Sequence, residues 1–265
     1  MSRGKSRKRQ RNYQSGNPRW VVAALGAAGV LVVALAAVAL NPGLTPDSSY
    51  DMAQQASVLE PAAPAPIPLA VFLGDSFVEG SQVSLPERFP FLLGATKGWQ
   101  VDSRGEGGTG YVTDGPAEYP ERSPFPGRVQ GVIDAKPDIV IVAGGLNDTG
   151  PGYGDQQLTD AITNTLSPLR LALPDAQIVV VGPLWPNGFP PDSAIQVRDR
   201  MSAVASSLDL QFIDPIAELW FTGSRDGTTT PGNRTQFILA DGTHPNAAGH
   251  RYIAERLAAD IGSAD

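Results

Sequence analysis

Residues 69–76 read LAVFLGDS, and this stretch decides the fold that we expect for the 265-residue chain. Its first five residues are all apolar, which is typical of a short β-strand buried on both faces of a sheet. The strand is expected to end at Gly74, Asp75 and Ser76, because these residue types favour turns. A strand of this kind predicts a parallel sheet that is covered by helices on both sides.

Other segments of the chain repeat this pattern of short apolar runs separated by helical periodicity. We expect strands at residues 138–143 and 177–181, a weaker one at 211–213 and another near 99–102, and helices at 155–173, 193–208 and 246–261. The alternation predicts one α/β domain over residues 69–265, built as a three-layer α/β/α sandwich with a mainly parallel sheet.

The N-terminal region has the charge pattern of a membrane segment. Residues 20–40 are 21 uncharged residues, enough for a helix to cross a bilayer core of roughly 30 Å. Residues 1–19 hold seven of the 20 basic residues and no acidic one. By the positive-inside rule we expect a basic cytoplasmic head at 1–19, a single transmembrane signal-anchor at 20–40, and the rest outside the cytoplasmic membrane. The alternative is a cleaved signal peptide, with a small-residue cleavage site at 37–39, which would make the protein secreted.

A linker is expected between the membrane segment and the domain. Residues 41–68 are polar and end in alternating proline and alanine, a composition that favours an extended spacer.

The composition excludes several classes of protein. The chain has no cysteine, so it can form neither a disulfide framework nor a thiolate metal site, and its two histidines are too few for a histidine-rich zinc site. Beyond residue 19 there are 13 basic against 27 acidic residues, which argues against a nucleic-acid partner. No nucleotide or metal motif is present, and we expect no cofactor and no metal.

Polar motifs follow two of the apolar segments, and a third precedes the last helix. In open α/β sheets ligands bind outside the carboxyl ends of the strands, so the residues after each strand are the candidates for chemistry. Ser76 follows the first strand at the start of a helix, where free backbone N–H groups can stabilise a developing oxyanion. Asn147 follows the strand at 138–143. Each motif alone is also explained as ordinary turn or cap chemistry.

The third motif, DGTHPN at residues 241–246, precedes the last helix. Its three-residue offset lets the Asp241 carboxylate reach one imidazole nitrogen of His244 while the other nitrogen faces outward. A histidine oriented in this way is half of a catalytic triad. By contrast, His250 lies inside the predicted helix, and we expect it to be a surface or packing residue.

Taken together, the motifs resemble the SGNH/GDSL hydrolase family, which is named for residues in four separated blocks. The first block is matched by residues 74–76, the third by 145–148 and the last by 241–245. The second block supplies a glycine, for which RGEGGTG at 104–110 offers several candidates. The four blocks occur in the family's order, and the resemblance covers residues 69–261. It implies a flavodoxin-like α/β/α fold and a serine esterase or lipase activity.

The resemblance also implies roles for single residues. Ser76 would be the nucleophile, His244 the general base and then acid, and Asp241 the residue that orients His244. The oxyanion hole would consist of the Ser76 and Gly108 backbone N–H groups and the Asn147 side chain, with Gly107 as the alternative glycine.

Two long loops, residues 183–192 and 222–236, are expected to line the sides of the site. Trp185 and Phe189, with Phe77 as a further candidate, would supply apolar or sugar-stacking surface for substrate. The alternative is that the two loop aromatics only pin a proline-rich loop to the core.

The expected activity is ester hydrolysis outside the cytoplasmic membrane. The substrate would be an acetylated or acylated envelope glycan, a lipid or a small ester. An O-acyltransferase using the same residues and a catalytically silent envelope-binding module are the alternatives.

Overall fold

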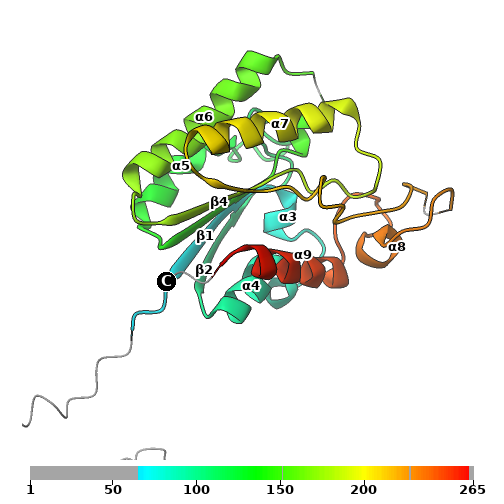
Figure 1. The fold of residues 1–265 in the computed structure, drawn as a ribbon, viewed down its shortest axis with the longest axis horizontal. Coiled ribbons are helices and arrows are strands. Elements are labelled where there is room, and N and C mark those ends of the chain that lie inside the picture. The colour runs from blue at the N-terminus through cyan, green and yellow to red at the C-terminus, as the bar shows by residue number, and fades with distance from the viewer. Residues whose placement is uncertain (1–64, 151, 227, 263–265) are drawn as a thin grey trace, which may run out of the picture. The chain divides into compact units, whose positions relative to one another are not determined.

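The computed structural model describes residues 65–150, 152–226 and 228–262 (Figure 1). The basic head, the predicted membrane segment and most of the predicted linker therefore lie outside the described residues. In the ranges that are described, no helix combines the length and the apolar character needed to cross a membrane.

Five parallel strands form the central sheet. They are β1 (Leu69–Gly74), β2 (Gln100–Gly105), β3 (Ile139–Ala143), β4 (Gln177–Val181) and β5 (Gln211–Ile213), and they lie in the order β2-β1-β3-β4-β5. This is the flavodoxin-like order, in which the chain changes direction along the sheet between β1 and β3. The predicted parallel α/β sheet is thus confirmed, and all five strands overlap the predicted segments, although β2 continues to Gly105, beyond the predicted 99–102.

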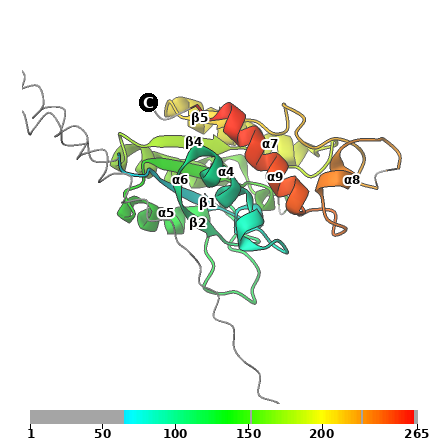
Figure 2. The same ribbon diagram turned by 90° about the horizontal axis from the view of Figure 1, so that it is seen from below.

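Helices cover both faces of the sheet. On one face lie α4 (Phe89–Lys97) and α9 (Ala247–Asp260), and on the other α5 (Phe125–Asp134), α6 (Asp155–Ala172) and α7 (Asp192–Ser207), as Figures 1 and 2 show. The short elements are α3 (Ser76–Glu79), η1 (Leu85–Glu87), η2 (Asn147–Thr149) and α8 (Arg234–Phe237).

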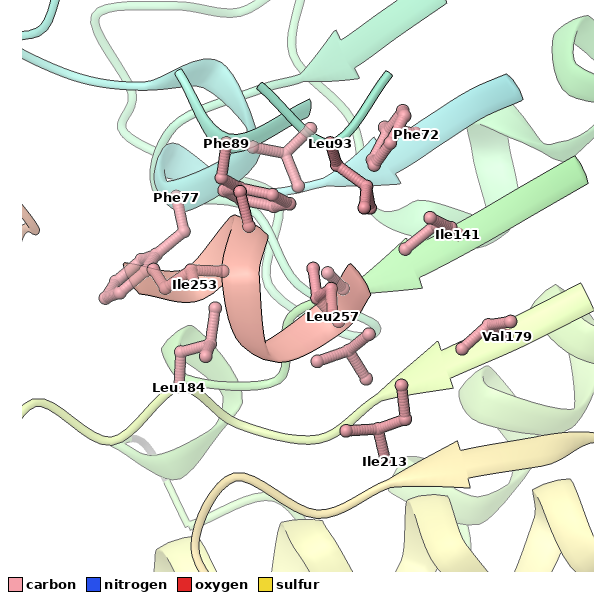
Figure 3. Packing of buried hydrophobic residues seen from close by; sticks show 14 of the residues in the cluster. Phe72, Phe77, Phe89, Leu93, Ile141, Val179, Leu184, Ile213, Ile253 and Leu257 are labelled. Carbon is pink, nitrogen blue, oxygen red and sulfur yellow. The ribbon is translucent and has the colours of Figure 1, made fainter. Parts of the chain in front are cut away.

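The two faces bury alternate residues of the same strands. Phe72, Ile141 and Val179 point toward α4 and α9 (Figure 3). Their neighbours Val71 and Val140 pack against the helices of the opposite face. Burial on both sides explains why these strands are continuous apolar runs instead of alternating ones.

Helix α9 carries His250 into the core on one face of the sheet. The His250 side chain is fully buried, and its ring stacks on that of Phe89 with 6.0 Å between the ring centroids. Its Nδ1 accepts a hydrogen bond of 3.2 Å from the Phe89 backbone N–H. His250 is therefore a packing residue, one of the two roles that the sequence predicted for it.

Candidate active site

Ser76 stands at a tight turn between β1 and α3. Its side chain emerges at the first residue of the helix, and the carboxylate of the preceding Asp75 accepts a 2.9 Å hydrogen bond from the Phe77 N–H. The turn requires glycine at position 74, because a Cβ there would lie 2.4 Å from the Ala143 carbonyl oxygen of β3. The sequence GDS thus places a hydroxyl at the carboxyl edge of the sheet, next to the change of strand direction.

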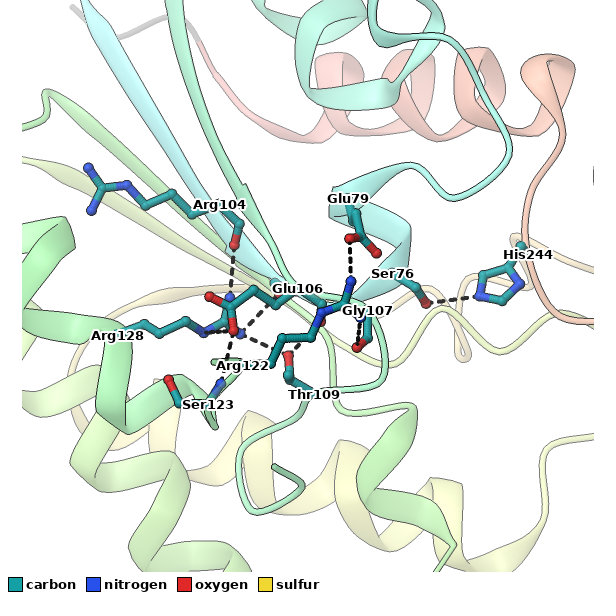
Figure 4. Close-up of polar contacts among 11 residues, drawn as sticks. Ser76, Glu79, Arg104, Glu106, Gly107, Thr109, Arg122, Ser123, Arg128 and His244 are labelled. Atoms are coloured by element: carbon teal, nitrogen blue, oxygen red, sulfur yellow. Dashed lines mark hydrogen bonds and ion pairs between the residues drawn. The ribbon is translucent and has the colours of Figure 1, made fainter. Parts of the chain in front are cut away.

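His244 reaches Ser76 from the other end of the chain. Its Nε2 lies 3.0 Å from the Ser76 Oγ (Figure 4), and its Nδ1 lies 2.8 Å from the Asp241 Oδ2. The structure therefore brings Ser76, His244 and Asp241 together in one hydrogen-bonded chain. Such a chain can transfer a proton from the hydroxyl to the imidazole while the carboxylate holds the ring in place.

Asp241 is held by its own turn. Its other oxygen, Oδ1, accepts hydrogen bonds from the Thr243 and His244 N–H groups at 2.9 and 3.0 Å. Partial burial acts to raise the pKa of Asp241, but these hydrogen bonds and that of the His244 ring outweigh it and lower the pKa to about 2. The Gln82 side chain adds a further hydrogen bond of 3.0 Å to Oδ2. No motif in the sequence pointed to Gln82, which lies in an exposed loop after α3.

The glycine-rich loop that follows β2, residues 106–110, is called the glycine loop here, and it lies against Ser76. Gly107, Gly108 and Asn147 line the cavity of about 390 Å³ that also contains Ser76 and His244. Gly108 has a φ of +79°, and a Cβ at this position would lie 2.6 Å from the Pro116 Cδ. Conformation and space therefore both favour glycine at position 108.

Asp148 holds the residues that directly follow the glycine loop. Its buried carboxylate accepts hydrogen bonds from the backbone N–H groups of Tyr111, Val112 and Thr113 at 2.8 to 3.1 Å. Asp75 and Asp148 thus both hold loops of the site by accepting hydrogen bonds from backbone N–H groups. The two carboxylates also interact electrostatically. Burial first, and then the charge of Asp148, raise the pKa of Asp75 to about 7.

Two arginines that sequence reasoning missed hold the site together (Figure 4). Arg128, on α5, donates hydrogen bonds to the carbonyls of Gly74 and Arg104 and to the Thr109 hydroxyl, at 2.9 to 3.1 Å. It thus joins the ends of β1 and β2 to the glycine loop. Arg122 contacts the same loop and Glu79. A single arginine in an amphipathic helix or a loop carries no sequence signal that would predict such a contact.

The two long loops meet beside the site, where a groove runs along them. The groove consists of two adjacent hollows, and both are lined by Trp185, Asn187 and Arg225. The inner hollow shares Leu146 and Thr243 with the Ser76 cavity. The groove therefore lies next to the cavity that holds the serine.

Of the predicted aromatic residues, two line this groove and one does not. Trp185 is half-buried, and Phe189 is 59 % exposed. Phe77 is 1 % exposed and packs in the core with α9 (Figure 3), so the expectation that it contacts substrate is wrong. Its ring lies 6.1 Å, between ring centroids, from that of His244, but it is covered by the core and has no surface to offer a substrate.

No group of three or more metal-ligating side chains is assembled within residues 65–150, 152–226 and 228–262.

A flavodoxin-like sheet that brings a serine, a histidine and an aspartate together at its carboxyl edge has the arrangement of a serine hydrolase, and the family match makes the protein a carboxylic ester hydrolase. Residues 72–252 match the GDSL-like Lipase/Acylhydrolase family. Because this match covers well over half of the chain, the protein belongs to that family.

Individual relatives agree with this assignment. The chain is 30% identical over 200 residues to the GDSL lipase Rv0518 of Mycobacterium tuberculosis, covering 72% of this chain and 80% of the relative. Among solved structures it is similar in fold to the aryl esterase of M. smegmatis, with a TM-score of 0.55, 17% identity, and 72% and 97% of the two chains covered. It is also similar to a family two carbohydrate esterase from Clostridium thermocellum, with a TM-score of 0.53, 20% identity, and 76% and 66% covered.

Proposed function

We propose that the protein is a serine esterase in which Ser76 is the nucleophile, His244 the general base and acid, and Asp241 the residue that orients His244. The observation that carries this proposal is the hydrogen-bonded chain from Ser76 Oγ through His244 to Asp241. Ser76 Oγ attacks the ester carbonyl carbon while its proton moves to His244 Nε2. Collapse of the tetrahedral intermediate breaks the bond to the alcohol oxygen, which takes that proton and leaves an acyl-Ser76 ester. Water then repeats the sequence and releases the acid.

The negative charge of the tetrahedral intermediate needs donors on the cavity wall. The Ser76 and Gly108 N–H groups and the Asn147 amide are the donors in this proposal, since all three residues line the cavity that holds the serine hydroxyl. Removing one donor of this kind typically costs about 2.7 to 4 kcal/mol of transition-state stabilisation. Gly108 is preferred to Gly107 as the loop donor, because the Gly107 carbonyl is held by Arg122 on the opposite side of their shared peptide.

The groove beside the cavity supports a substrate whose alcohol part is larger than a simple alkyl group. Trp185 and Phe189 offer aromatic surface, and Asn187 holds both, since its Oδ1 accepts hydrogen bonds from the Trp185 ring N–H at 3.3 Å and the Phe189 N–H at 2.8 Å. A fixed indole next to polar loop residues is suited to stacking on a sugar. We therefore propose removal of acetyl or acyl groups from an envelope glycan, lipid or small ester. Action outside the cytoplasmic membrane rests on the apolar segment at residues 20–40.

The test is an assay of the purified chain on p-nitrophenyl esters from acetyl to palmitoyl, beside Ser76→Ala. The expected result is turnover that the substitution abolishes, together with a fluorophosphonate adduct on Ser76 in the unsubstituted chain only. Turnover that survives in Ser76→Ala would refute the assignment of the nucleophile. An added sugar acceptor separates hydrolysis from acyl transfer, because transfer yields the acylated sugar in place of the free acid.

A further inference from the structure

Two charged side chains outside the triad, those of Arg122 and Glu79, meet beside the glycine loop, and both residues line the same cavity as Ser76. The Arg122 guanidinium donates one hydrogen bond from Nη1 to the Gly107 carbonyl and another of 2.8 Å from Nη2 to the Glu79 Oε1 (Figure 4). Its plane also lies over the ring of Tyr119, with 4.3 Å from the guanidinium carbon to the ring centroid. Arg122 therefore joins the glycine loop to α3, the helix that begins with Ser76.

The contact at Gly107 is close and directional. A Cβ at this residue would lie 2.4 Å from the Glu79 Oε2 and 2.9 Å from the Arg122 Nη1, so only glycine lets both charged groups approach the loop. The segment that carries Arg122 is itself fixed, because the next residue, Ser123, donates its N–H to the Glu106 carboxylate at 3.0 Å. The Arg122 side chain is only 18 % exposed, which shields its hydrogen bonds from water.

We infer that Arg122 is a positioning residue for the oxyanion hole, and this inference rests on the proposed function of Ser76. The Gly107 carbonyl and the Gly108 N–H belong to one planar trans peptide and point in opposite directions. A cation that holds the Gly107 carbonyl therefore fixes the direction of the Gly108 N–H, and Gly108 lines the cavity that holds the serine hydroxyl. The glycine-rich loop has little steric restriction of its own, so this anchor replaces the rigidity that side chains would supply.

Arg122 also acts through charge. A charge-assisted hydrogen bond to the carbonyl polarises the peptide and makes its N–H a better donor to an oxyanion. In addition, Arg122 pairs with Glu79, whose carboxylate lines the same cavity as Ser76. Without Arg122 that negative charge would be unpaired beside the developing oxyanion and would oppose it.

The test compares Arg122→Gln with the unsubstituted chain on p-nitrophenyl acetate. We expect kcat to fall about 10- to 100-fold while KM changes less than about threefold, since the lost interaction acts on the transition state. In Arg122→Ala, added guanidinium ion at millimolar concentration is expected to restore part of kcat. Removing the carboxylate as well, in the double variant Glu79→Gln with Arg122→Gln, should recover several-fold of the loss, because the unpaired charge is gone.

Arg104→Gln is the matched control. Arg104 forms a similar ion pair with Asp102 at 2.6 Å at the end of β2, but its guanidinium does not contact the glycine loop. We expect this variant to keep the kcat of the unsubstituted chain. Should Arg122→Gln not fold, Arg122→Lys retains the cation but has a single nitrogen in place of the two that bind Gly107 and Glu79, and is expected to show an intermediate kcat.

A kcat of Arg122→Gln within twofold of the unsubstituted chain would overturn the inference, as would a kcat loss in Arg122→Ala that guanidinium leaves unchanged in a folded protein. Failure of the proposed function looks different. In that case the unsubstituted chain itself has no Ser76-dependent turnover and forms no fluorophosphonate adduct.

Discussion

The Asn147 side-chain amide donates a hydrogen bond of 2.8 Å to the backbone carbonyl of Thr109. This bond joins the loop after β3 to the glycine loop after β2, and it uses one of the two amide protons of Asn147. The second proton is free to serve the oxyanion. Asn147 is therefore both a tether of the glycine loop and a candidate donor.

Replacing Asn147 by alanine removes both contributions. We expect kcat to fall about 10²- to 10³-fold with little change in KM, as is typical for loss of an oxyanion donor. Initial rates on p-nitrophenyl acetate measure this, and the melting temperature reports the tether separately. Activity within a few-fold of the unsubstituted chain would remove Asn147 from the oxyanion hole.

Asp241→Asn is expected to lower kcat on the order of 10³- to 10⁴-fold, because the amide cannot both accept from the His244 ring and stabilise its positive charge. Gln82→Ala, which removes only a neighbouring hydrogen bond to Asp241, serves as the matched control and should lose no more than several-fold. Since the pKa of Asp241 is lowered to about 2, it stays ionised from pH 5 to 9, and the pH–rate profile of the unsubstituted chain should show no inflection from this group.

The buried His250 makes the domain sensitive to acid. Burial first, and then the charges of Arg88 and His244, lower its pKa to about 4 from the ordinary 6.5. Between these values the unfolded chain binds a proton that the folded chain does not, so stability is lost as the pH falls from about 6.5 toward 4. We expect the loss to be on the order of 3 kcal/mol at most.

Urea unfolding at pH 7 and pH 4.5 tests the role of His250. In His250→Asn, whose side-chain oxygen can accept the Phe89 N–H, the difference in unfolding free energy between the two pH values should be smaller than in the unsubstituted chain. Equal differences would show that another group causes the acid sensitivity.

Asp75 has the opposite effect. Because burial raises its pKa to about 7, the folded chain retains a proton that the unfolded chain has released above about pH 3.8. The contribution of Asp75 to stability is therefore greatest below about pH 3.8 and is lost as the pH rises toward 7. Asp75→Asn keeps an acceptor for the Phe77 N–H but cannot ionise, so its stability relative to the unsubstituted chain should increase between pH 4 and 8. Unfolding midpoints across this range provide the measurement, and a constant difference would contradict it.

Trp185→Ala tests the groove. We expect kcat/KM to fall about 10-fold or more for an acetylated oligosaccharide but less than about twofold for p-nitrophenyl acetate, because stacking contributes only to the larger substrate. Exposed Leu171 on α6 provides a control for apolar surface loss. If Trp185→Ala lowered kcat/KM equally for both substrates, the indole would only pack the loop and would not bind the sugar.

The sheet and the triad were predictable for the same reason. The strand β3 is apolar on both faces, which is visible in five consecutive residues, and the motifs that follow β1 and precede α9 are short and local. The partners Arg122, Arg128 and Gln82 were not predictable, because each acts through a tertiary contact with a loop distant in the sequence. Phe77 was misjudged because the direction of its side chain depends on a four-residue helix whose packing only the fold reveals.

Ser76 and His244 are separated by 168 residues, and the histidine lies just before α9, which packs on the sheet. During synthesis the serine therefore leaves the ribosome long before its base. A chain that is cut, or still growing, ahead of residue 241 has a hydroxyl at the end of β1 but lacks the histidine that would take its proton. Catalytic competence is thus the last property the domain acquires, and turnover reports on completion of the whole fold.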